Sequence, residues 1–221
     1  MSSIVVSGDT SGSVTLSAPA IANTTVLTLP SVSGTVLTSA TGQTLTSPTI
    51  TSPTISGAVV SAMGSSVITS GTAVASTSGT SIDFTGIPSW AKRVTVMFNG
   101  VSTSGTTAVL VQIGSGSVTT TGYTASSIGF YSPSGVNTAT YTTGFGMFSD
   151  QAAANRYGQM TISLLTGTTY ISSHTINSPN IVHGSFGAGG IALGGTLDRV
   201  RITTVNGTDT FDAGSINIMY E

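Results

Sequence analysis

The chain has 221 residues and a formal net charge of −2 at pH 7, and 5% of its residues are charged, against about 25% in an ordinary soluble domain. Such a chain has no basic field that could hold a nucleic-acid backbone or an anionic membrane. Cysteine is absent, which excludes a disulfide framework, a thiolate nucleophile and a zinc–thiolate site. The hydrophobic content of 38% argues against intrinsic disorder, and the abundance of Ser, Thr, Gly and Val predicts an all-β fold.

The N-terminal region, residues 1–80, is predicted to be an extended attachment arm. Its only charged side chain is Asp9, and its apolar residues occur in short alternating runs at 14–16, 27–29 and 36–37, separated by turn clusters. Each run is too short to bury an apolar face alone, because single hairpins are marginal in water. The region therefore needs a partner, either two further copies of itself or a larger assembly. A flexible Ser/Thr-rich linker is the alternative interpretation.

A tandem repeat lies within this region. Residues 45–56 read LTSPTITSPTIS, in which the unit T-S-P-T-I occurs twice. A proline at this spacing breaks a helix and deletes ladder bonds from a central strand. A repeat of odd length would also turn its isoleucines to opposite faces of a flat strand. We therefore expect a winding stem of three parallel chains, a homotrimer, with Ile50, Ile55 and Val59 at its axis.

Residues 81–221 are predicted to form an antiparallel β-sandwich of jelly-roll-like type. Residues 93–101, RVTVMFNGV, alternate apolar residues on one face with Thr, Met and Asn on the other. Residues 108–113, AVLVQI, are apolar on both faces, which suits a strand inside a sandwich. Further alternating runs occur in GQMTISLL, DRVRITTV and SINIMYE. Short strands separated by turns are typical of a sandwich or jelly roll.

Two local signals refine this prediction. Asn206-Gly207 lies between two alternating runs, and this dipeptide predicts a two-residue β-hairpin. The best helical candidate is the segment 150–157, DQAAANRY, with one or two turns.

The series SGDTSGSVTLSAPAIANTTVLTLPSVSGTVLTS, together with TLTSPTITSPTISG, resembles the stem and attachment segments of tailed-bacteriophage virion proteins. The segment IDFTGIPSWAKRVTVMFNGVSTSG looks like C-terminal domains at the ends of such proteins. The resemblance implies a structural protein of the virion, commonly trimeric, attached through its N-terminal part. It implies either a tail fibre that contacts a glycan or protein of the host surface, or a head fibre or decoration protein that stabilises the shell. The chain lacks the long repetitive shaft of many tail fibres, which keeps a head-decoration protein or a small tail adaptor open as alternatives.

No constellation predicts catalysis. The two histidines, His174 and His183, have no G-x-S-x-G elbow to accompany them and are interpreted as structural or surface groups. Glycan cleavage usually needs two acidic groups at a defined separation, but the only glutamate is Glu221 and the aspartates pair only as Asp209 and Asp212. That pair is interpreted as turn chemistry rather than a calcium site. A polysaccharide-degrading spike or a secreted enzyme is therefore disfavoured, and we expect no cofactor or metal. The first residues, MSSIVVSGDT, have no Lys or Arg and no long apolar run, so no signal peptide is expected.

Residues 187–195, GAGGIALGG, match G-x-G-x-x-A formally. The dinucleotide motif needs a helix after the glycines, and the following Gly-Gly would break it. The segment is instead predicted to be a loop or a tightly packed strand.

Aromatic residues concentrate between residues 123 and 157. Tyr131, Tyr141 and Phe145 are the candidates for exposed binding aromatics, because flat apolar rings with polar edges hold sugars and protein partners. The alternative is that these rings belong to the core and to a trimer interface.

Overall fold

The computed structural model describes residues 3–7, 13–17, 68–131, 135–149 and 151–221. The chain divides into two units, residues 1–58 and 59–221.

The first unit contains an antiparallel hairpin of β1 (Ser3–Ser7) and β2 (Ser13–Ser17). Strand β2 agrees with the apolar run predicted at 14–16. The runs predicted at 27–29 and 36–37 lie outside the described residues, as do the predicted stem residues Ile50, Ile55 and Val59.

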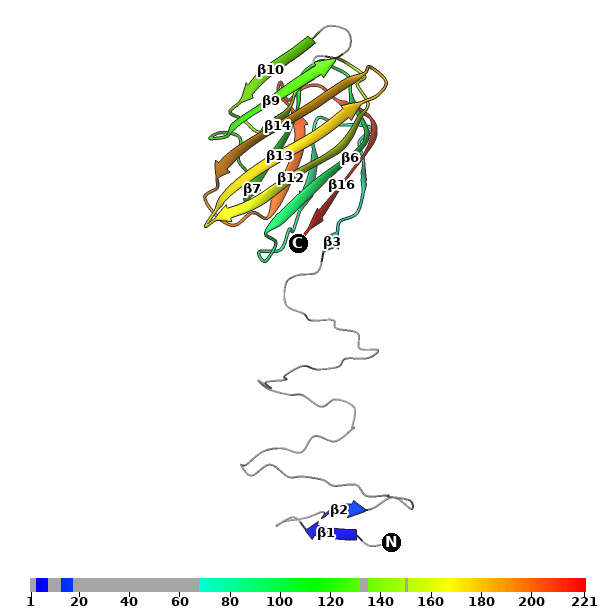
Figure 1. Ribbon diagram of the computed structural model, residues 1–221, viewed down its shortest axis with the longest axis vertical. Helices are drawn as coiled ribbons and strands as arrows, with labels where there is room; N and C mark the ends of the chain where they lie inside the picture. The colour runs from blue at the N-terminus through cyan, green and yellow to red at the C-terminus, as the bar shows by residue number, and fades with distance from the viewer. Residues whose placement is uncertain (1–2, 8–12, 18–67, 132–134, 150) are drawn as a thin grey trace. The chain divides into compact units, whose positions relative to one another are not determined.

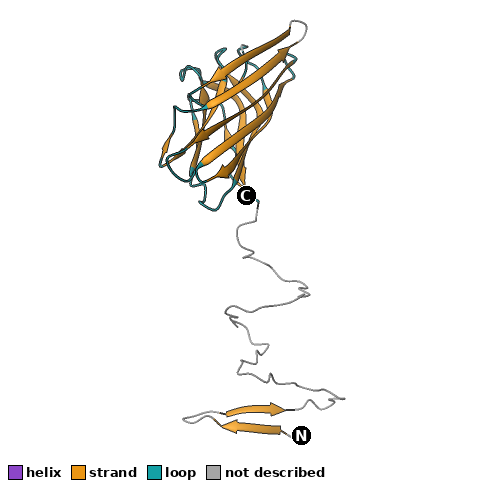
Figure 2. Ribbon diagram, turned by 60° about the vertical axis from the view of Figure 1, so that its left-hand side comes forward, coloured by secondary structure: helices purple, strands orange, loops and turns teal. Residues whose placement is uncertain are grey.

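The second unit is all-β, with two antiparallel sheets lying against each other (Figures 1 and 2). The large sheet has nine strands in the order β10-β9-β14-β13-β12-β6-β16-β3, with β4 also on β16. Its strands are β3 (Thr69–Ser70), β4 (Val74–Ala75), β6 (Arg93–Thr103), β9 (Thr124–Tyr131), β10 (Gly135–Tyr141), β12 (Arg156–Thr166), β13 (Thr169–Ser178), β14 (His183–Ala192) and β16 (Phe211–Tyr220).

The small sheet has five strands in the order β11-β7-β15-β5, with β8 on β7. These strands are β5 (Ile82–Thr85), β7 (Val109–Ser115), β8 (Ser117–Val118), β11 (Phe145–Met147) and β15 (Arg199–Thr204).

A large hydrophobic core fills the space between the sheets. Val96 and Met160 enter it from the large sheet, and Val111 and Val200 enter it from the small sheet. The alternation predicted for β6, β12, β15 and β16 is confirmed, because the predicted apolar face of each strand is the one that contributes to this core. The run AVLVQI is buried on both faces as β7, also as predicted.

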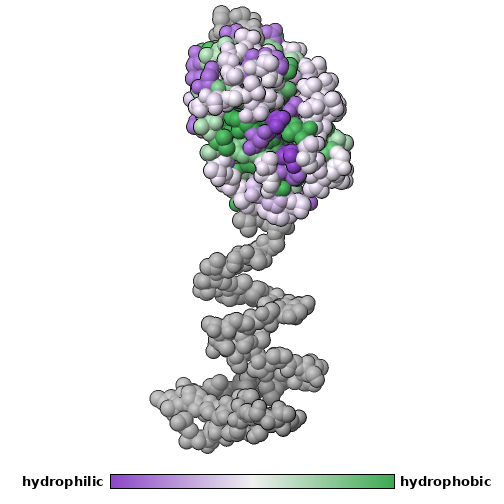
Figure 3. Space-filling model, turned by 180° about the vertical axis from the view of Figure 1, so that it is seen from behind, coloured by the Kyte–Doolittle hydropathy of each residue, from purple (hydrophilic) through white to green (hydrophobic). Residues whose placement is uncertain are grey.

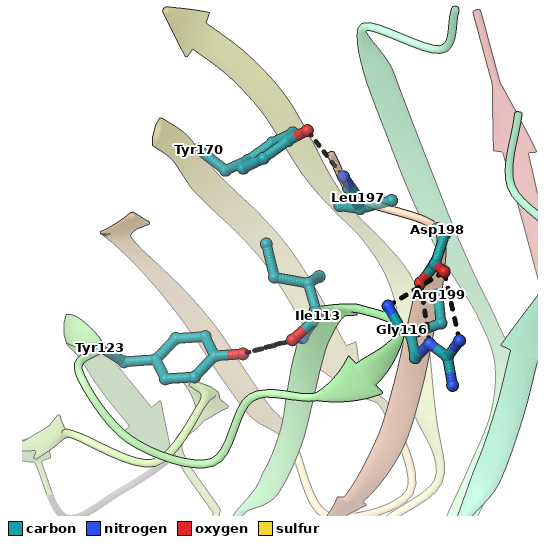
Figure 4. Close-up of polar contacts among 7 residues, drawn as sticks. All are labelled: Ile113, Gly116, Tyr123, Tyr170, Leu197, Asp198 and Arg199. Atoms are coloured by element: carbon teal, nitrogen blue, oxygen red, sulfur yellow. Dashed lines mark hydrogen bonds and ion pairs between the residues drawn. The ribbon is translucent and has the colours of Figure 1, made fainter. Parts of the chain in front are cut away.

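Two buried tyrosines form hydrogen bonds with backbone groups through their hydroxyls (Figure 4). Tyr123 accepts a hydrogen bond from the amide of Ile113 at 2.8 Å and can donate to the carbonyls of Ile113 and Thr119. Tyr170, on β13, accepts from the amide of Leu197 at 3.1 Å. Desolvation by burial raises the pKa of Tyr123 to about 12, so its hydroxyl stays protonated at physiological pH. Tyr123 therefore satisfies a backbone amide of β7, and Tyr170 satisfies one in the connection before β15.

The predicted boundary at residue 80 is wrong, because the second unit, which we call the sandwich unit, begins before that residue. Residues 69–70 and 74–75 already pair with β16. Ser76 is fully buried and donates its amide to the carbonyl of Gly214 and its hydroxyl to that of Ala213. These strands are hard to recognise in the sequence, because each has only two residues and so shows no alternating pattern.

The helix predicted at 150–157 is absent from the described part of that segment, which forms a turn and the start of β12. Ala153 has a positive φ of 56°, which ends any helical run. Asn180 fixes the turn from outside: its side chain donates to the carbonyl of Ala153 at 2.8 Å and accepts from the amide of Asn155 at 2.9 Å. Long-range hydrogen bonds thus override the local preference of the alanines.

The Asn206-Gly207 turn exists, but the predicted hairpin is wrong. The turn connects β15 of the small sheet with β16 of the large sheet, and these strands do not pair. The Asn206 side chain accepts hydrogen bonds from the amides of Thr208 and Asp209, and Gly207 adopts a φ of +68°. The side-chain hydrogen bonds make a wider turn that carries the chain from one layer to the other.

Candidate binding surfaces

Four neighbouring strands of the large sheet, β10, β9, β14 and β13, present one continuous face away from the core, which we call the outer face (Figure 1). Strand registration aligns its residues in rows. In one row Thr138 pairs with Ile128, Ile128 with Phe186, and Phe186 with Thr175. Because side chains alternate along each strand, these residues share the face opposite to the buried His174.

An apolar patch lies on the outer face near the β10 edge. It consists of Phe130, Phe186, Val136 and Ile128. The first three are exposed by 48%, 46% and 67%. The rings of Phe130 and Phe186 are tilted, with their centroids 6.1 Å apart, and Val136 lies directly opposite Phe130. Gly184 makes room for the Phe130 ring, because a Cβ at that position would lie 2.4 Å from Phe130 Cζ. The patch is therefore packed in a defined geometry rather than scattered.

A shallow groove adjoins the apolar patch. A hollow of about 390 Å³ is lined in part by Phe186, Ile128 and Ser126, and a second hollow of about 220 Å³ by Thr124, Ser126 and Thr140. The two hollows share Ser126 and are therefore contiguous. The outer face thus offers aromatic rings at one end of the groove and hydroxyl groups at the other, an arrangement that fits a partner with apolar and polar parts.

The four strands of the outer face contain no Asp, Glu, Lys or Arg. The histidines on β13 and β14 are both buried. A face without charge offers no ion pair to an anionic or cationic ligand, so its recognition rests on shape, apolar contact and hydroxyl groups.

The aromatic residues that the sequence singled out do not form this surface. Tyr141 and Phe145 are exposed by 7% and 1%, so the prediction that they are exposed binding groups is wrong. Phe145 packs edge-to-face on Tyr123 with centroids 5.0 Å apart, and the Tyr141 hydroxyl lies 3.3 Å from that of Ser127. Both belong to the interior, as the alternative interpretation held. Tyr131 is the last residue of β9, and the structure describes its backbone alone.

Sequence reasoning missed Phe186 as an exposed aromatic. It lies in the glycine-rich segment that was predicted to be a loop or a tightly packed strand, and the structure confirms the strand as β14. The alternation of side chains along a strand could have identified it. Ser185 and Gly187 face inwards, so Phe186 between them faces outwards.

The small sheet carries a third hollow, which is polar, on its side away from the core. It has about 370 Å³ and is lined in part by Gln112, Arg201 and Thr203. The view from behind shows hydrophilic and apolar residues side by side on this face (Figure 3). The polar groups have partners within the chain: Arg201 forms a bidentate pair with Asp83 at 2.7 and 2.9 Å, and Gln112 donates to the carbonyl of Thr143. The hollow is therefore better explained as a stabilised sheet surface than as a ligand site.

Both histidines are buried. His174 lies 3.2 Å from the Ser185 hydroxyl through Nε2, and burial lowers its pKa from 6.5 to about 4, so it is neutral at pH 7. His183 packs near the ring of Phe148, with centroids 6.2 Å apart. This agrees with the interpretation of the histidines as structural groups.

Arg156, at the start of β12, is the largest fully buried side chain of the described residues. Its Nη1 donates to the carbonyl of Ala154 at 3.1 Å. Burial lowers the pKa of Arg156 to about 10, against the opposing effect of the negative charge of Asp212, so the side chain stays charged at neutral pH. We interpret it as a structural cation that fixes the turn before β12.

Asp209 serves the turn chemistry expected of it. Its carboxylate accepts hydrogen bonds from the Asn206 side chain and from the amide and hydroxyl of Thr107. These bonds hold the pKa of Asp209 below its usual value. Among the described residues, no group of three or more His, Asp or Glu side chains is placed to hold a metal ion.

The described part of the chain contains no helix with the length and apolarity needed to cross a membrane. Comparisons of the chain with known protein families, with curated proteins and with solved structures give no match.

Proposed function

We propose that this chain is a non-enzymatic structural protein of a tailed-phage virion. In this proposal the N-terminal region anchors a homotrimer to other virion proteins, and the sandwich unit, of jelly-roll-like type, is exposed. The protein acts as a tail fibre in host attachment. The observation that carries the proposal is the division of the chain: a proline-punctuated region whose only charged residue is Asp9 precedes an all-β unit that begins at β3.

The outer face supports a role in attachment. Its apolar patch and hydroxyl-lined groove lack charged groups, and neutral sugars or uncharged protein surfaces have matching chemistry. The chain enters the sandwich unit beside its last strand, since Thr69 pairs with Tyr220. The C-terminal end of β9 lies at the opposite end of the unit (Figure 1). A domain connected at one end leaves the other end and both broad faces available for contacts.

The experiment is immunogold electron microscopy of purified phage particles with an antibody against residues 68–221. Gold on the tail tip or tail fibres supports the proposal. Gold on the head supports the alternative role, in which the protein is a head fibre or decoration protein that stabilises the shell. Protein found only in the particle-free fraction of the lysate would contradict both virion roles.

A further inference from the structure

Among the described strands of the sandwich unit, one edge of the large sheet differs from the other sheet edges. Strand β10 has seven residues, and the described strands pair with it on one side only, through β9. The opposite edge is formed by β3 and β4 with two residues each. In the small sheet, β11 has three residues, and β5 has four and carries Asp83.

Natural proteins protect exposed edge strands with short length, charge, proline or a β-bulge, because unpaired backbone groups recruit further strands. The short and charged edges of this unit follow that rule. Strand β10, GVNTATY, has no charge and no proline, and its pairing with β9 is regular from Gly135 to Tyr141. An edge without protection is expected where a partner strand covers it.

We propose that β10 pairs antiparallel with β10 of a second copy of this chain, which joins two large sheets into one. The sequence of the strand is self-complementary in this arrangement. With Thr138 at the centre, Thr138 faces its own equivalent and Val136 faces Thr140 of the other copy. On the inner face Asn137 meets Ala139. The outer-face pairs are thus β-branched residues, which pack well across strands.

The charge distribution favours a second copy as the occupant. A two-fold axis brings identical residues together, so any charged residue near it would meet a like charge. No Asp, Glu, Lys or Arg occurs on β10 or on the next three strands. Pairing also covers Val136, the most exposed large apolar side chain of the apolar patch at 67%. Self-pairing therefore removes apolar surface from water without electrostatic repulsion.

The first test compares molar mass by light scattering for the full chain and two variants. Thr138→Lys places a charge on the proposed axis. Thr175→Lys makes the same change at an exposed position of the same face, on β13. We expect the wild type and Thr175→Lys to have twice the mass of Thr138→Lys, or a higher even multiple. Equal masses for the wild type and Thr138→Lys, with unchanged circular dichroism, would overturn the pairing.

This readout separates the edge pairing from the proposed trimer. The mass of Thr138→Lys itself reports the assembly that remains, and a trimer is about three times 22.0 kDa. A monomeric Thr138→Lys with a dimeric wild type supports the edge pairing and contradicts the trimer. A trimeric mass for both proteins contradicts the edge pairing and supports the trimer.

The second test is disulfide cross-linking, which is clean because the chain has no cysteine. Facing Cβ atoms in an antiparallel pair lie about 4.5–5.5 Å apart, close enough for a disulfide after small shifts. Thr138→Cys is expected to form covalent dimers on oxidation, whereas Thr175→Cys is not. Val136→Cys and Thr140→Cys are expected to cross-link only when mixed. Self-cross-linking of Val136→Cys would overturn the register, and cross-linking of Thr138→Cys no greater than that of Thr175→Cys would overturn the proposal.

Discussion

His174 is a titratable side chain on the buried face of the large sheet, and this position couples folding to pH. Its folded-state pKa of about 4 lies below the value of 6.5 for an exposed histidine. The unfolded chain therefore binds the proton first as pH falls. The stability that depends on neutral His174 is fully present above pH 6.5 and is lost between pH 6.5 and 4. The loss approaches ~3 kcal/mol, since each pKa unit corresponds to about 1.4 kcal/mol.

Urea denaturation at pH 7, 5.5 and 4.5 measures this loss. His174→Gln is the control, because glutamine keeps a hydrogen-bonding side chain near Ser185 and does not titrate. We expect the free energy of unfolding of the variant to fall less steeply over this range than that of the wild type. The carboxylates affect both proteins equally, so the difference between the two slopes reports His174. Parallel slopes would show that His174 stays accessible to protons in the folded state.

At the scale of secondary-structure elements, the glycines of β14 allow the neighbouring strand to approach closely. A Cβ at Gly187 would lie 2.4 Å from the carbonyl oxygen of Ser126 and 2.7 Å from His174 Cε1. We expect Gly187→Ala to lower the free energy of unfolding by about 1–3 kcal/mol, the usual cost of overpacking.

Gly190→Ala is the matched control on the same strand. A Cβ at Gly190 would lie 3.4 Å from its nearest neighbour, the carbonyl oxygen of Tyr170, which is ordinary contact. Its stability should change by less than about 0.5 kcal/mol. Chemical denaturation of both variants measures the difference, and equal effects would contradict the steric explanation.

The first strands of the sandwich unit determine how far the chain can be truncated from its N-terminus without loss of stability. A fragment of residues 68–221 keeps β3, β4 and the buried Ser76, whereas a fragment of residues 81–221 loses them. The shorter fragment leaves the carbonyls of Ala213 and Gly214 without their Ser76 partners and uncovers one side of β16. We expect it to melt at a lower temperature or to aggregate. Thermal unfolding followed by circular dichroism compares the fragments; equal melting temperatures would show that residues 68–80 add no stability.

The strands were predictable where burial imposes a strict period. The runs around Val96, Met160 and Val200 alternate because one face of each strand meets the core. The two-residue strands β3 and β4 were missed because so short a segment shows no period. The turn at Ala153 was misread because a long-range hydrogen bond from Asn180 decides it. The turn at Asn206 was misread because the strands on its two sides pair in different sheets.

The candidate surface was less predictable than the fold, because aromatic residues suit both cores and binding sites. Tyr141 and Phe130 occur in the same Gly/Ser/Thr-rich stretch, yet Tyr141 is buried and Phe130 is half exposed. The inward or outward orientation of each ring depends on the register of β9, β10 and β14. The sequence indicates that register only once the strand ends are known.

At the scale of the whole molecule, the proposed function requires the two regions of the chain to have different tasks. The outer face and the β10 edge belong to the sandwich unit and offer uncharged contact surfaces. The proposed stem belongs to the region before it, and its three copies would bring three such surfaces together. Several weak, uncharged contacts made at once can give strong overall attachment, because binding at the second and third sites becomes intramolecular.

Substitutions in the repeat LTSPTITSPTIS test whether it forms the proposed stem. With Ile50 and Ile55 at a three-fold axis, the double variant Ile50→Asp/Ile55→Asp would bring two carboxylates from each chain close to that axis. Losing a buried apolar side chain costs about 2–5 kcal/mol, and repulsion between the carboxylates and their desolvation add to this cost. We expect this variant to lose the trimer or to melt at a much lower temperature. Thr49→Ser/Thr54→Ser, which keeps the isoleucines, should behave like the wild type.

Light scattering and thermal melting of the full chain decide between stem and linker, since solvated aspartates in a loose linker cost almost nothing. An aspartate variant with the mass and melting temperature of the wild type would contradict the stem.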